Sequence, residues 1–407
     1  MARDDGTEAP GRLAAATLAL HAGAEDRLPG APVAPSLVQA ASFHTHPDAV
    51  GFSANDLGEG GPHFYGRWGN PTVDLLEARL AALEGGAAAV CFASGMAAIA
   101  ALFADRLSVG DHLVLSEVCY AGVAELAHDL LPRQGIAVTA VDSADPDAVA
   151  AAMRPETRLV HVETPANPIL RLTDIAAIAR VAHAGGAELS VDSTIATPLG
   201  QRPLALGADH VVHSLTKYLG GHGDALGGAV ITGAARAGSL RRGSLIHLGG
   251  CLAPASAWLI LRGMESLSAR MALHQENARR VAAFLAGHPA VASVLWPGAA
   301  DHPQAALAAR QMTNFSGLLA FTARTGSAAL ARRLAERLRL FAYAVSLGKT
   351  RSLLFYIPTA DLLRSSFRLD GAAAEAYRAW AGEGVFRVSV GLEDAADLIA
   401  DLEQALG

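Results

Sequence analysis

Short apolar runs alternate with amphipathic segments between residues 72 and 250, and this alternation limits the folds open to the chain more than any other feature. The runs are apolar throughout instead of at every second position, which indicates strands buried on both faces. Strands that alternate with helices predict a mostly parallel sheet covered by helices on both sides. The expected strands are 87–93, 112–117, 137–142, 159–164, 189–193, 210–214 and 228–233, with helices such as 72–84 and 172–186 between them.

The flanking segments follow other patterns, so the 407 residues divide into three parts. Residues 1–64 are rich in Gly, Pro, His and Ser with weak periodicity, and we expect an extended arm there. Residues 65–252 hold the predicted parallel sheet and form a large domain. Residues 253–407 begin with one long expected helix over 256–287 and continue with a few strands and helices, which is typical of a smaller α+β domain.

Composition excludes several classes of protein. The chain is 51% hydrophobic and 17% charged, which suits a large core and a large subunit interface. A net charge of -7 without a basic cluster argues against a nucleic-acid partner. The three cysteines are too scattered for a disulfide framework or a metal site, and no apolar run is long enough to span a membrane. We therefore expect a soluble, cytoplasmic protein.

Polar residues gather where the predicted strands end. Ligands of parallel sheets bind outside the carboxyl ends of the strands. The passage from strand to helix at Ser94-Gly95-Met96 could hold a phosphate on backbone N–H groups, although Ser94 as a helix N-cap explains the tripeptide equally well. The other strand ends supply Glu163 with Asn167, then Asp192, and finally Ser214, Thr216 and Lys217.

A lysine, a carboxylate and a phosphate site on one sheet edge suggest one cofactor. Lys217 at the end of a buried strand is partly desolvated, so its amine loses its proton more readily and can attack an aldehyde. Asp192 on the same edge can keep a pyridine nitrogen protonated. Pyridoxal phosphate (PLP) needs both groups and supplies the electron sink itself.

Competing motifs are incomplete. Ser214 and Lys217 satisfy the Ser-x-x-Lys pattern of penicillin-binding acyl enzymes, but the Lys-Thr-Gly partner is missing. Residues 348–350 read Gly-Lys-Thr, yet the first glycine of a Walker loop is absent. His210 and His213 would point to opposite faces of a strand, so we expect packing or capping histidines and no metal site.

Six further motifs are spread along the chain in order: "FYGRWGNPT" (64–72), "ASGMAAI" (93–99), "ETPANP" (163–168), "SLTKYLGGHGD" (214–224), "VSLG" (345–348) and "FRVSVGLED" (386–394). Through these motifs nearly the whole chain resembles the Cys/Met-metabolism PLP enzymes, the group of cystathionine γ-synthase, cystathionine γ-lyase, methionine γ-lyase and the homoserine sulfhydrylases. The resemblance implies the aspartate aminotransferase-like α/β fold (fold type I), with a mostly parallel large domain and a smaller α+β C-terminal domain. It also implies a homotetramer, a dimer of dimers with shared active sites.

The same resemblance implies a role for each residue of the site. Lys217 is the Schiff-base lysine, Asp192 partners the pyridinium nitrogen, and Tyr120 stacks on the cofactor ring and protonates the leaving group. Arg387 clamps the substrate α-carboxylate, with Ser346 beside it. The remaining cofactor contacts are Asn167 near the 3-oxygen, Ser94, Gly95, Met96, Ser214 and Thr216 at the phosphate, and Tyr65 and Arg67 reaching the phosphate of the neighbouring subunit.

The motifs leave the reaction open. The same residues serve γ-elimination, which gives 2-oxobutyrate, ammonia and a thiol or other leaving group, and γ-replacement by a thiol. Arg351 stands where the family commonly has an acidic residue, with Lys349 two positions before it. Arg351 would repel a distal ammonium, and it would either favour a distal carboxylate or project to solvent. This leaves room for a specialised substrate, including one with a non-sulfur leaving group. We favour γ-elimination. A β-eliminating or transaminating enzyme of the same fold and a non-catalytic relative are the alternatives.

Overall fold

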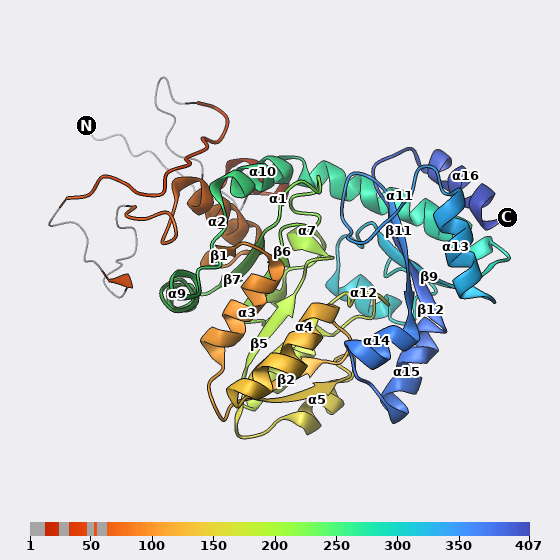
Figure 1. Ribbon diagram of the computed structural model, residues 1–407, viewed down its shortest axis with the longest axis horizontal. Helices are drawn as coiled ribbons and strands as arrows, with labels where there is room; N and C mark the ends of the chain where they lie inside the picture. The colour runs from red at the N-terminus through yellow and green to blue at the C-terminus, as the bar shows by residue number, and fades with distance from the viewer. Residues whose placement is uncertain (1–12, 24–31, 47–52, 55–62) are drawn as a thin grey trace, which may run out of the picture.

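The computed structural model describes residues 13–23, 32–46, 53–54 and 63–407 (Figure 1). Within these residues, two sheets form the framework. The larger sheet uses strands between residues 88 and 232, and the smaller uses strands between 291 and 389. No helix in the described ranges combines the length and the apolar character needed to cross a membrane.

The larger sheet has seven strands in the order β1-β7-β6-β5-β4-β2-β3. The strands β6, β5, β4, β2 and β3 are parallel, and β7 is antiparallel to both β6 and β1. Each observed strand overlaps a predicted one, so the mostly parallel sheet is confirmed. The bounds are β1 Ala88–Phe92, β2 His112–Ser116, β3 Ala137–Val141, β4 Thr157–Glu163, β5 Glu188–Asp192, β6 His210–Ser214 and β7 Gly228–Thr232.

Helices cover both faces of this sheet. In β1, Val90 and Phe92 belong to the core that α3 completes, whereas Ala89 and Cys91 pack with α2. Both alternating sets are apolar, which explains why the strands lack a period of two. The helical elements of this part are α2 Pro71–Glu84, α3 Gly95–Arg106, α4 Ala121–Glu125, η2 Leu126–Leu130, η3 Leu131–Gln134, α5 Pro146–Ala152, α6 Ile175–Ala184, α7 Thr197–Gly200, η4 Pro203–Leu206, α8 Ala234–Leu240, η5 Arg241–Leu245 and α9 Ile246–Leu248.

The smaller sheet has five strands in the order β10-β11-β12-β9-β8, and all its pairs except β10 with β11 are antiparallel. Phe321 and Phe386 stack across β9 and β12 in the core of this sheet. The strands are β8 Val291–Leu295, β9 Leu318–Ala323, β10 Ala342–Tyr343, β11 Leu353–Pro358 and β12 Gly384–Ser389. The helices are α10 Pro254–Glu265, α11 Leu267–Gly287, α12 Ala305–Gln311, α13 Ser327–Arg337, α14 Thr359–Ser365, α15 Gly371–Ala381 and α16 Ala395–Leu406.

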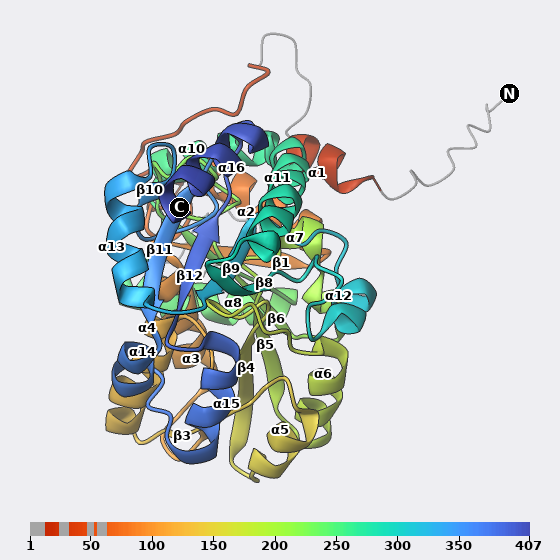
Figure 2. The same cartoon turned by 90° about the vertical axis from the view of Figure 1, so that its right-hand side faces the viewer.

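The two parts pack against each other over a wide contact. Figures 1 and 2 both show α14 beside α4, where Ser366 donates a hydrogen bond to Glu125 at 2.7 Å. Phe367 and Tyr377, from the carboxyl-terminal part, belong to the same apolar core as Phe103 of α3. The division into an arm (1–64), a large domain (65–252) and a small domain (253–407) stays a proposal.

Two local expectations are wrong. The predicted long helix over 256–287 is interrupted at Ser266, where the backbone turns (φ -98°, ψ 4°) between α10 and α11. The buried guanidinium of Arg270 stabilises this turn, because its Nε donates to the Ser266 hydroxyl at 3.0 Å and its Nη2 to the Gly263 carbonyl at 2.7 Å. Inside the expected extended arm, residues Ala15–His21 form the helix α1, and Ala19 is buried against α2. Parts of the arm lie outside the described residues.

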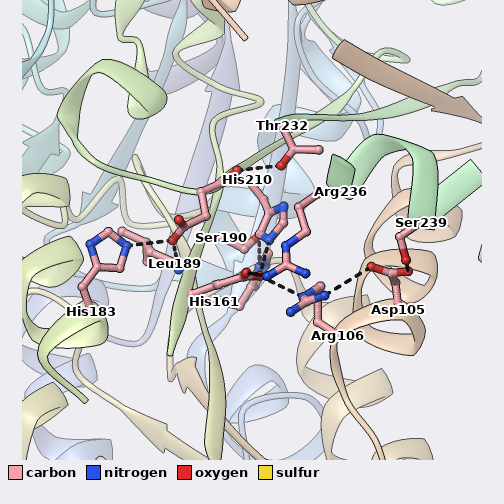
Figure 3. Close-up of polar contacts among 12 residues, drawn as sticks. Asp105, Arg106, His161, His183, Leu189, Ser190, His210, Thr232, Arg236 and Ser239 are labelled. Atoms are coloured by element: carbon pink, nitrogen blue, oxygen red, sulfur yellow. Dashed lines mark hydrogen bonds and ion pairs between the residues drawn. The ribbon is translucent and has the colours of Figure 1, made fainter. Parts of the chain in front are cut away.

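A charged cluster ties the amino ends of β5 and β6 to α3 and α8 (Figure 3). Glu188 opens β5 and accepts a hydrogen bond from His210 at 2.8 Å. It also forms ion pairs with Arg106, at 2.8 Å, and with Arg236. Burial opposes ionisation of Glu188, but the hydrogen bond and charge of His210, with Arg106 and Arg236, lower its pKa to about 2. The cluster lies at the end of the strands opposite to the polar strand ends noted in the sequence.

Candidate active site

The polar strand ends converge at the carboxyl edge of the large sheet, next to a loop of the small sheet. Glu163 and Asp192 end the neighbouring parallel strands β4 and β5 and are directly opposite in register. Lys217 follows β6, and Ser346 and Arg387 arrive from the carboxyl-terminal part. Hydrogen bonds link these residues into one site.

Asp192 is held by the residue two positions after it. The backbone N–H and the hydroxyl of Thr194 both donate to Oδ1 of Asp192, at 2.9 and 2.6 Å. The same hydroxyl accepts from the backbone N–H of Ser214 at 2.8 Å, which joins the ends of β5 and β6. Burial raises the pKa of Asp192, while the bonds from Thr194 and the charge of Lys217 oppose the rise. Oδ2 accepts no hydrogen bond from any described residue, so it is available to a cationic N–H.

Glu163 fixes the backbone at two other predicted site residues. Its Oε2 accepts from the backbone N–H of Tyr120 at 2.5 Å, and its Oε1 accepts from the backbone N–H of Asn167 at 2.8 Å. Burial, followed by the neighbouring charge of Asp192, raises the pKa of Glu163 to about 8. Two carboxyl groups on adjacent strands in a buried setting disfavour double ionisation, which favours the protonated form of Glu163.

The Lys217 side chain reaches toward the loop before β11. Its Nζ donates to the Ser346 hydroxyl at 3.0 Å. Burial lowers the pKa of Lys217 to about 8, and the positive charges of Arg387 and Lys349 act in the same direction. A substantial fraction of this amine is therefore neutral at physiological pH, as a nucleophile or proton acceptor requires.

Arg387 is a half-buried cation without an ion-pair partner among the residues described. Its Nη1 donates to Oδ1 of Asn167 at 2.9 Å, and its Nη2 donates to the backbone carbonyl of Ser346 at 3.1 Å. Ser346 adopts the left-handed backbone conformation (φ 86°), which places its carbonyl toward Arg387 and its hydroxyl toward Lys217. A partly desolvated guanidinium that is bonded to neutral acceptors still favours a carboxylate, so this position suits a carboxylate ligand.

The first turn of α3 presents free N–H groups to the end of β6. The Ser94 hydroxyl accepts from the backbone N–H of Ala97 at 3.1 Å, as an N-cap does, and leaves the N–H groups of Gly95 and Met96 without partners in the described chain. A Cβ on Gly95 would lie 3.0 Å from Cβ of Ser214, a tight contact, so glycine allows this close approach of helix and strand. Thr216 differs: its hydroxyl accepts from the Gly227 N–H at 3.1 Å.

Tyr120 lies at the mouth of the site, and its side chain is 47% exposed. It precedes α4, and a Cβ on Gly122 would come 2.9 Å from its ring. Tyr65 and Arg67 lie elsewhere in this chain. Arg67 donates to the backbone carbonyl of Ile246, and its guanidinium carbon is 5.5 Å from the Tyr65 ring centroid. Among the described residues, no hydrogen bond, ion pair or ring contact joins this pair to Lys217.

These groups suit PLP. The free N–H groups of α3 with the nearby Ser214 hydroxyl form a cradle for a phosphate dianion. The open Oδ2 of Asp192 provides a carboxylate for a pyridine N–H, and Lys217 provides an amine of lowered pKa for an aldehyde.

His210 and His213 do not point to a common site where they could bind a metal ion. His213 bonds Glu84 at 2.5 Å, and His210 bonds Glu188 at 2.8 Å, so each serves a separate buried pair. Across the described ranges, no three His, Cys, Asp or Glu side chains are grouped as metal ligands would be.

Sequence reasoning missed Thr194 and gave Glu163 no role. Thr194 had a local signal, because a hydroxyl residue two positions after an aspartate commonly closes such a turn. Glu163 had none, since its partners are the backbone N–H groups of Tyr120 and Asn167.

Comparisons with known proteins agree with this site. Residues 16–407 match the family described as Cys/Met metabolism PLP-dependent enzyme. The chain is 42% identical over 392 residues to the L-methionine gamma-lyase of Pseudomonas putida, covering 96% of each chain. It is also 42% identical over 409 residues to the cystathionine gamma-synthase of Mycobacterium bovis, covering 99% of this chain and 100% of that one. The structure resembles cystathionine gamma-lyase from Lactobacillus plantarum complexed with L-serine, with a TM-score of 0.85, 35% identity and coverage of 97% and 98%.

Proposed function

Because the chain belongs to the Cys/Met metabolism PLP-dependent enzymes, we propose that it catalyses γ-elimination on a γ-substituted L-amino acid. The products would be 2-oxobutyrate, ammonia and a thiol or other leaving group. One observation carries the proposal: the Lys217 amine, whose pKa burial lowers to about 8, bonds the Ser346 hydroxyl while Arg387 bonds the carbonyl of that serine. A proton-accepting amine thus lies beside a receptor for an amino-acid carboxylate.

In the proposed reaction, Arg387 binds the α-carboxylate of the substrate and Ser346 aligns Arg387 with Lys217. Bound PLP supplies an electron sink next to the substrate α-carbon. Once the substrate amine has displaced it from the cofactor, Lys217 Nζ would remove the proton from the α-carbon and pass it on to the cofactor. Neutral again, it would remove one proton from the β-carbon. Tyr120 Oη, at the exposed mouth of the site, donates a proton to the group that leaves the γ-carbon.

The remaining site residues hold the cofactor in this proposal. The Asp192 carboxylate accepts from the pyridine N–H, and the Tyr120 ring stacks on the pyridine ring. Asn167, which Glu163 and Arg387 already orient, lies near the ring 3-oxygen. Phosphate contacts come from Ser94, Gly95, Met96, Ser214 and Thr216, with Lys217 as the covalent attachment.

The proposed assembly is a cytoplasmic homotetramer in which each dimer shares its active sites. Within the described ranges, no hydrogen bond or ion pair joins Tyr65 or Arg67 to the site of their own chain, and in this proposal they reach the phosphate of the neighbouring subunit. Exposed apolar side chains near the site, Leu226 at 63% and Val345 at 64%, suit a subunit interface.

Mixed chains test the sharing of sites. Arg67→Ala and Lys217→Ala chains should each be inactive. When they are unfolded and refolded together, half of the sites in every mixed dimer are intact, so activity returns to about a quarter of wild type. Absence of any recovery, with light scattering showing dimers or tetramers, would contradict shared sites.

A second candidate is γ-replacement, because relatives named cystathionine gamma-synthase match the chain over its full length. The purified holoenzyme should be incubated with methionine, cystathionine, O-acetylhomoserine and O-succinylhomoserine, each with and without a thiol. We expect 2-oxobutyrate without a thiol and no product from Lys217→Ala. A thioether that forms only with thiol present would favour replacement, and pyruvate or pyridoxamine phosphate would overturn both γ-reactions.

A further inference from the structure

Two lysines are present among the 32 basic residues of the chain, and both lie at the same site. Lys349 lines a hollow of about 280 Å³ together with Thr216, Ser346 and residues 223–226. Lys217 is adjacent to this hollow, because its Nζ donates a 3.0 Å hydrogen bond to the hydroxyl of Ser346. The other 30 of these basic residues are arginines, so Lys349 is the one lysine besides the proposed catalytic Lys217.

The Lys349 side chain lies along Gly223. A Cβ on Gly223 would be 2.7 Å from Cε and 2.8 Å from Cδ of Lys349, and Gly223 adopts a left-handed backbone (φ 75°). Both features call for glycine and leave a channel for the lysine stem. Within the described part of the chain, the Lys349 ammonium has neither a hydrogen bond nor an ion pair. Asp224 also lines the hollow, but it is exposed and forms no ion pair with Lys349.

The backbone around Lys349 is held on both sides. Gly348 N donates to the Ser389 hydroxyl at 2.9 Å, and Thr350 N donates to the Gly221 carbonyl at 2.9 Å. Lys349 is consequently half-buried at the hollow, whereas Arg351 is exposed to solvent and does not line it. The sequence drew attention to Arg351 as the replacement for an acidic residue, but the structure places Lys349 at the site instead.

Three basic side chains, Arg387, Lys217 and Lys349, lie beside the position proposed for a bound amino acid. Arg387 lies on one side of Lys217, and the charge of Lys349 also acts on the Lys217 amine. With the α-carboxylate on Arg387 and the α-carbon near Lys217, the substrate side chain has the hollow lined by Lys349 beside it. An unpaired, partly desolvated ammonium there favours an anionic oxygen group.

We propose that Lys349 binds an anionic group, a carboxylate or a phosphate, at the distal end of the substrate's γ-substituent. This inference rests on the proposed function, because it assumes that an amino acid binds with its carboxylate on Arg387. It narrows the substrate class to γ-substituted amino acids that carry a second negative charge, and it disfavours a distal ammonium. The flexible four-carbon stem of Lys349 allows γ-substituents of more than one length.

Binding of non-reacting ligands tests the inference without turnover. L-2-Aminoadipate carries a distal carboxylate, L-norleucine ends in a methyl group at the same length, and neither has a γ leaving group. Isothermal titration of the holoenzyme should show aminoadipate binding about tenfold more tightly than norleucine, as expected for a partly buried charge pair. Lys349→Met should remove this preference, Lys349→Glu should reverse it, and Lys349→Arg should retain most of it.

Arg351→Met is the matched control and should leave the preference unchanged. A wild-type enzyme without the preference, a Lys349→Met variant that keeps it, or an Arg351→Met variant that loses it would overturn the inference. A phosphonate analogue of similar length distinguishes the two anions, because the tighter ligand identifies the group that Lys349 recognises.

Two further outcomes distinguish a substrate subsite at Lys349 from a role in binding the cofactor phosphate and from the proposed reaction. Titration of apoenzyme with PLP should give the same affinity for wild type and Lys349→Met. Weaker PLP binding by the variant, with the ligand preference intact, would assign Lys349 to the cofactor phosphate and overturn the inference. If no γ-substituted amino acid is converted but the aminoadipate preference holds, the anionic subsite stands and the proposed reaction falls.

Discussion

The amine of Lys217 offers a quantitative test of the site, because the chain has just two lysines and their labelling can be followed separately. Burial lowers the pKa of Lys217 from 10.5 to about 8. At pH 7.5 roughly a quarter of such an amine is neutral, against roughly one in a thousand at the ordinary value. The neutral fraction of Lys217 in the apoenzyme should therefore exceed that of a solvated lysine about 200-fold.

Competitive acylation measures this fraction. Apoenzyme is treated with trace isotopic acetic anhydride between pH 6.5 and 10, together with an unstructured lysine peptide as the internal reference. After unfolding and complete acylation with the other isotope, mass spectrometry gives the rate at each lysine. Burial slows the absolute rate at Lys217, but the midpoint of its pH profile depends on the pKa alone and should lie at about 8.

The charges next to Lys217 determine whether a substitution raises or lowers the pKa of its amine. Replacing Arg387 with leucine removes a positive charge that lowers the pKa of Lys217, so the midpoint should rise. Asp192→Asn removes a charge that raises this pKa, so the midpoint should fall. A wild-type midpoint near 10.5, or shifts opposite in sign to these, would refute the account of Lys217 as a buried amine between cations.

Three other predictions follow from the described contacts. Glu188→Gln removes an anion whose pKa is lowered from 4.5 to about 2, worth about 3 kcal/mol above pH 4.5, so calorimetry should show Tm lower by about 3 to 4 °C. That gap should close as pH falls from 4.5 toward 2, while Glu276→Gln, at an exposed i,i+3 pair, should leave Tm unchanged. Buried Glu163 keeps a proton between pH 4.5 and about 8, whereas the same carboxyl loses it in the unfolded chain. The wild-type apoenzyme should therefore lose stability relative to Glu163→Gln as pH rises through that range. A stability difference that stays constant with pH would contradict the raised pKa. Arg387→Leu should lower kcat/KM by roughly 100-fold or more, as expected for loss of a charge-assisted carboxylate contact, with the absorbance of bound PLP retained.

The sequence was most informative where a signal is local. Each of the seven strands of the large sheet overlaps its predicted run, because burial on both faces leaves an unbroken apolar segment of strand length. Asp192 and Lys217 were placed on one edge by the rule that parallel strands end together, and both lie at that edge. The hydrogen bond from Thr194 to Asp192 could also have been predicted, because the two residues are only two positions apart.

Other features depended on segments that are distant in the chain. The break at Ser266 is stabilised by Arg270, whose guanidinium also donates to the backbone carbonyl of Tyr218 at 2.8 Å, and no helical period reports such a contact. The helix α1 forms in a segment of weak periodicity because Ala19 packs against α2.

What the sequence by itself determined was therefore the order of strands and helices, the family, and the residue types available for chemistry. The tertiary structure alone decided which of these residues meet. It brought the carbonyl of Ser346 to Arg387, buried Glu163 under two backbone N–H groups, and placed Lys349 at the hollow while leaving Arg351 in solvent. The physical reason is range: periodicity and turn chemistry act over a few residues, whereas burial, charge pairing and pKa depend on neighbours supplied by the whole fold.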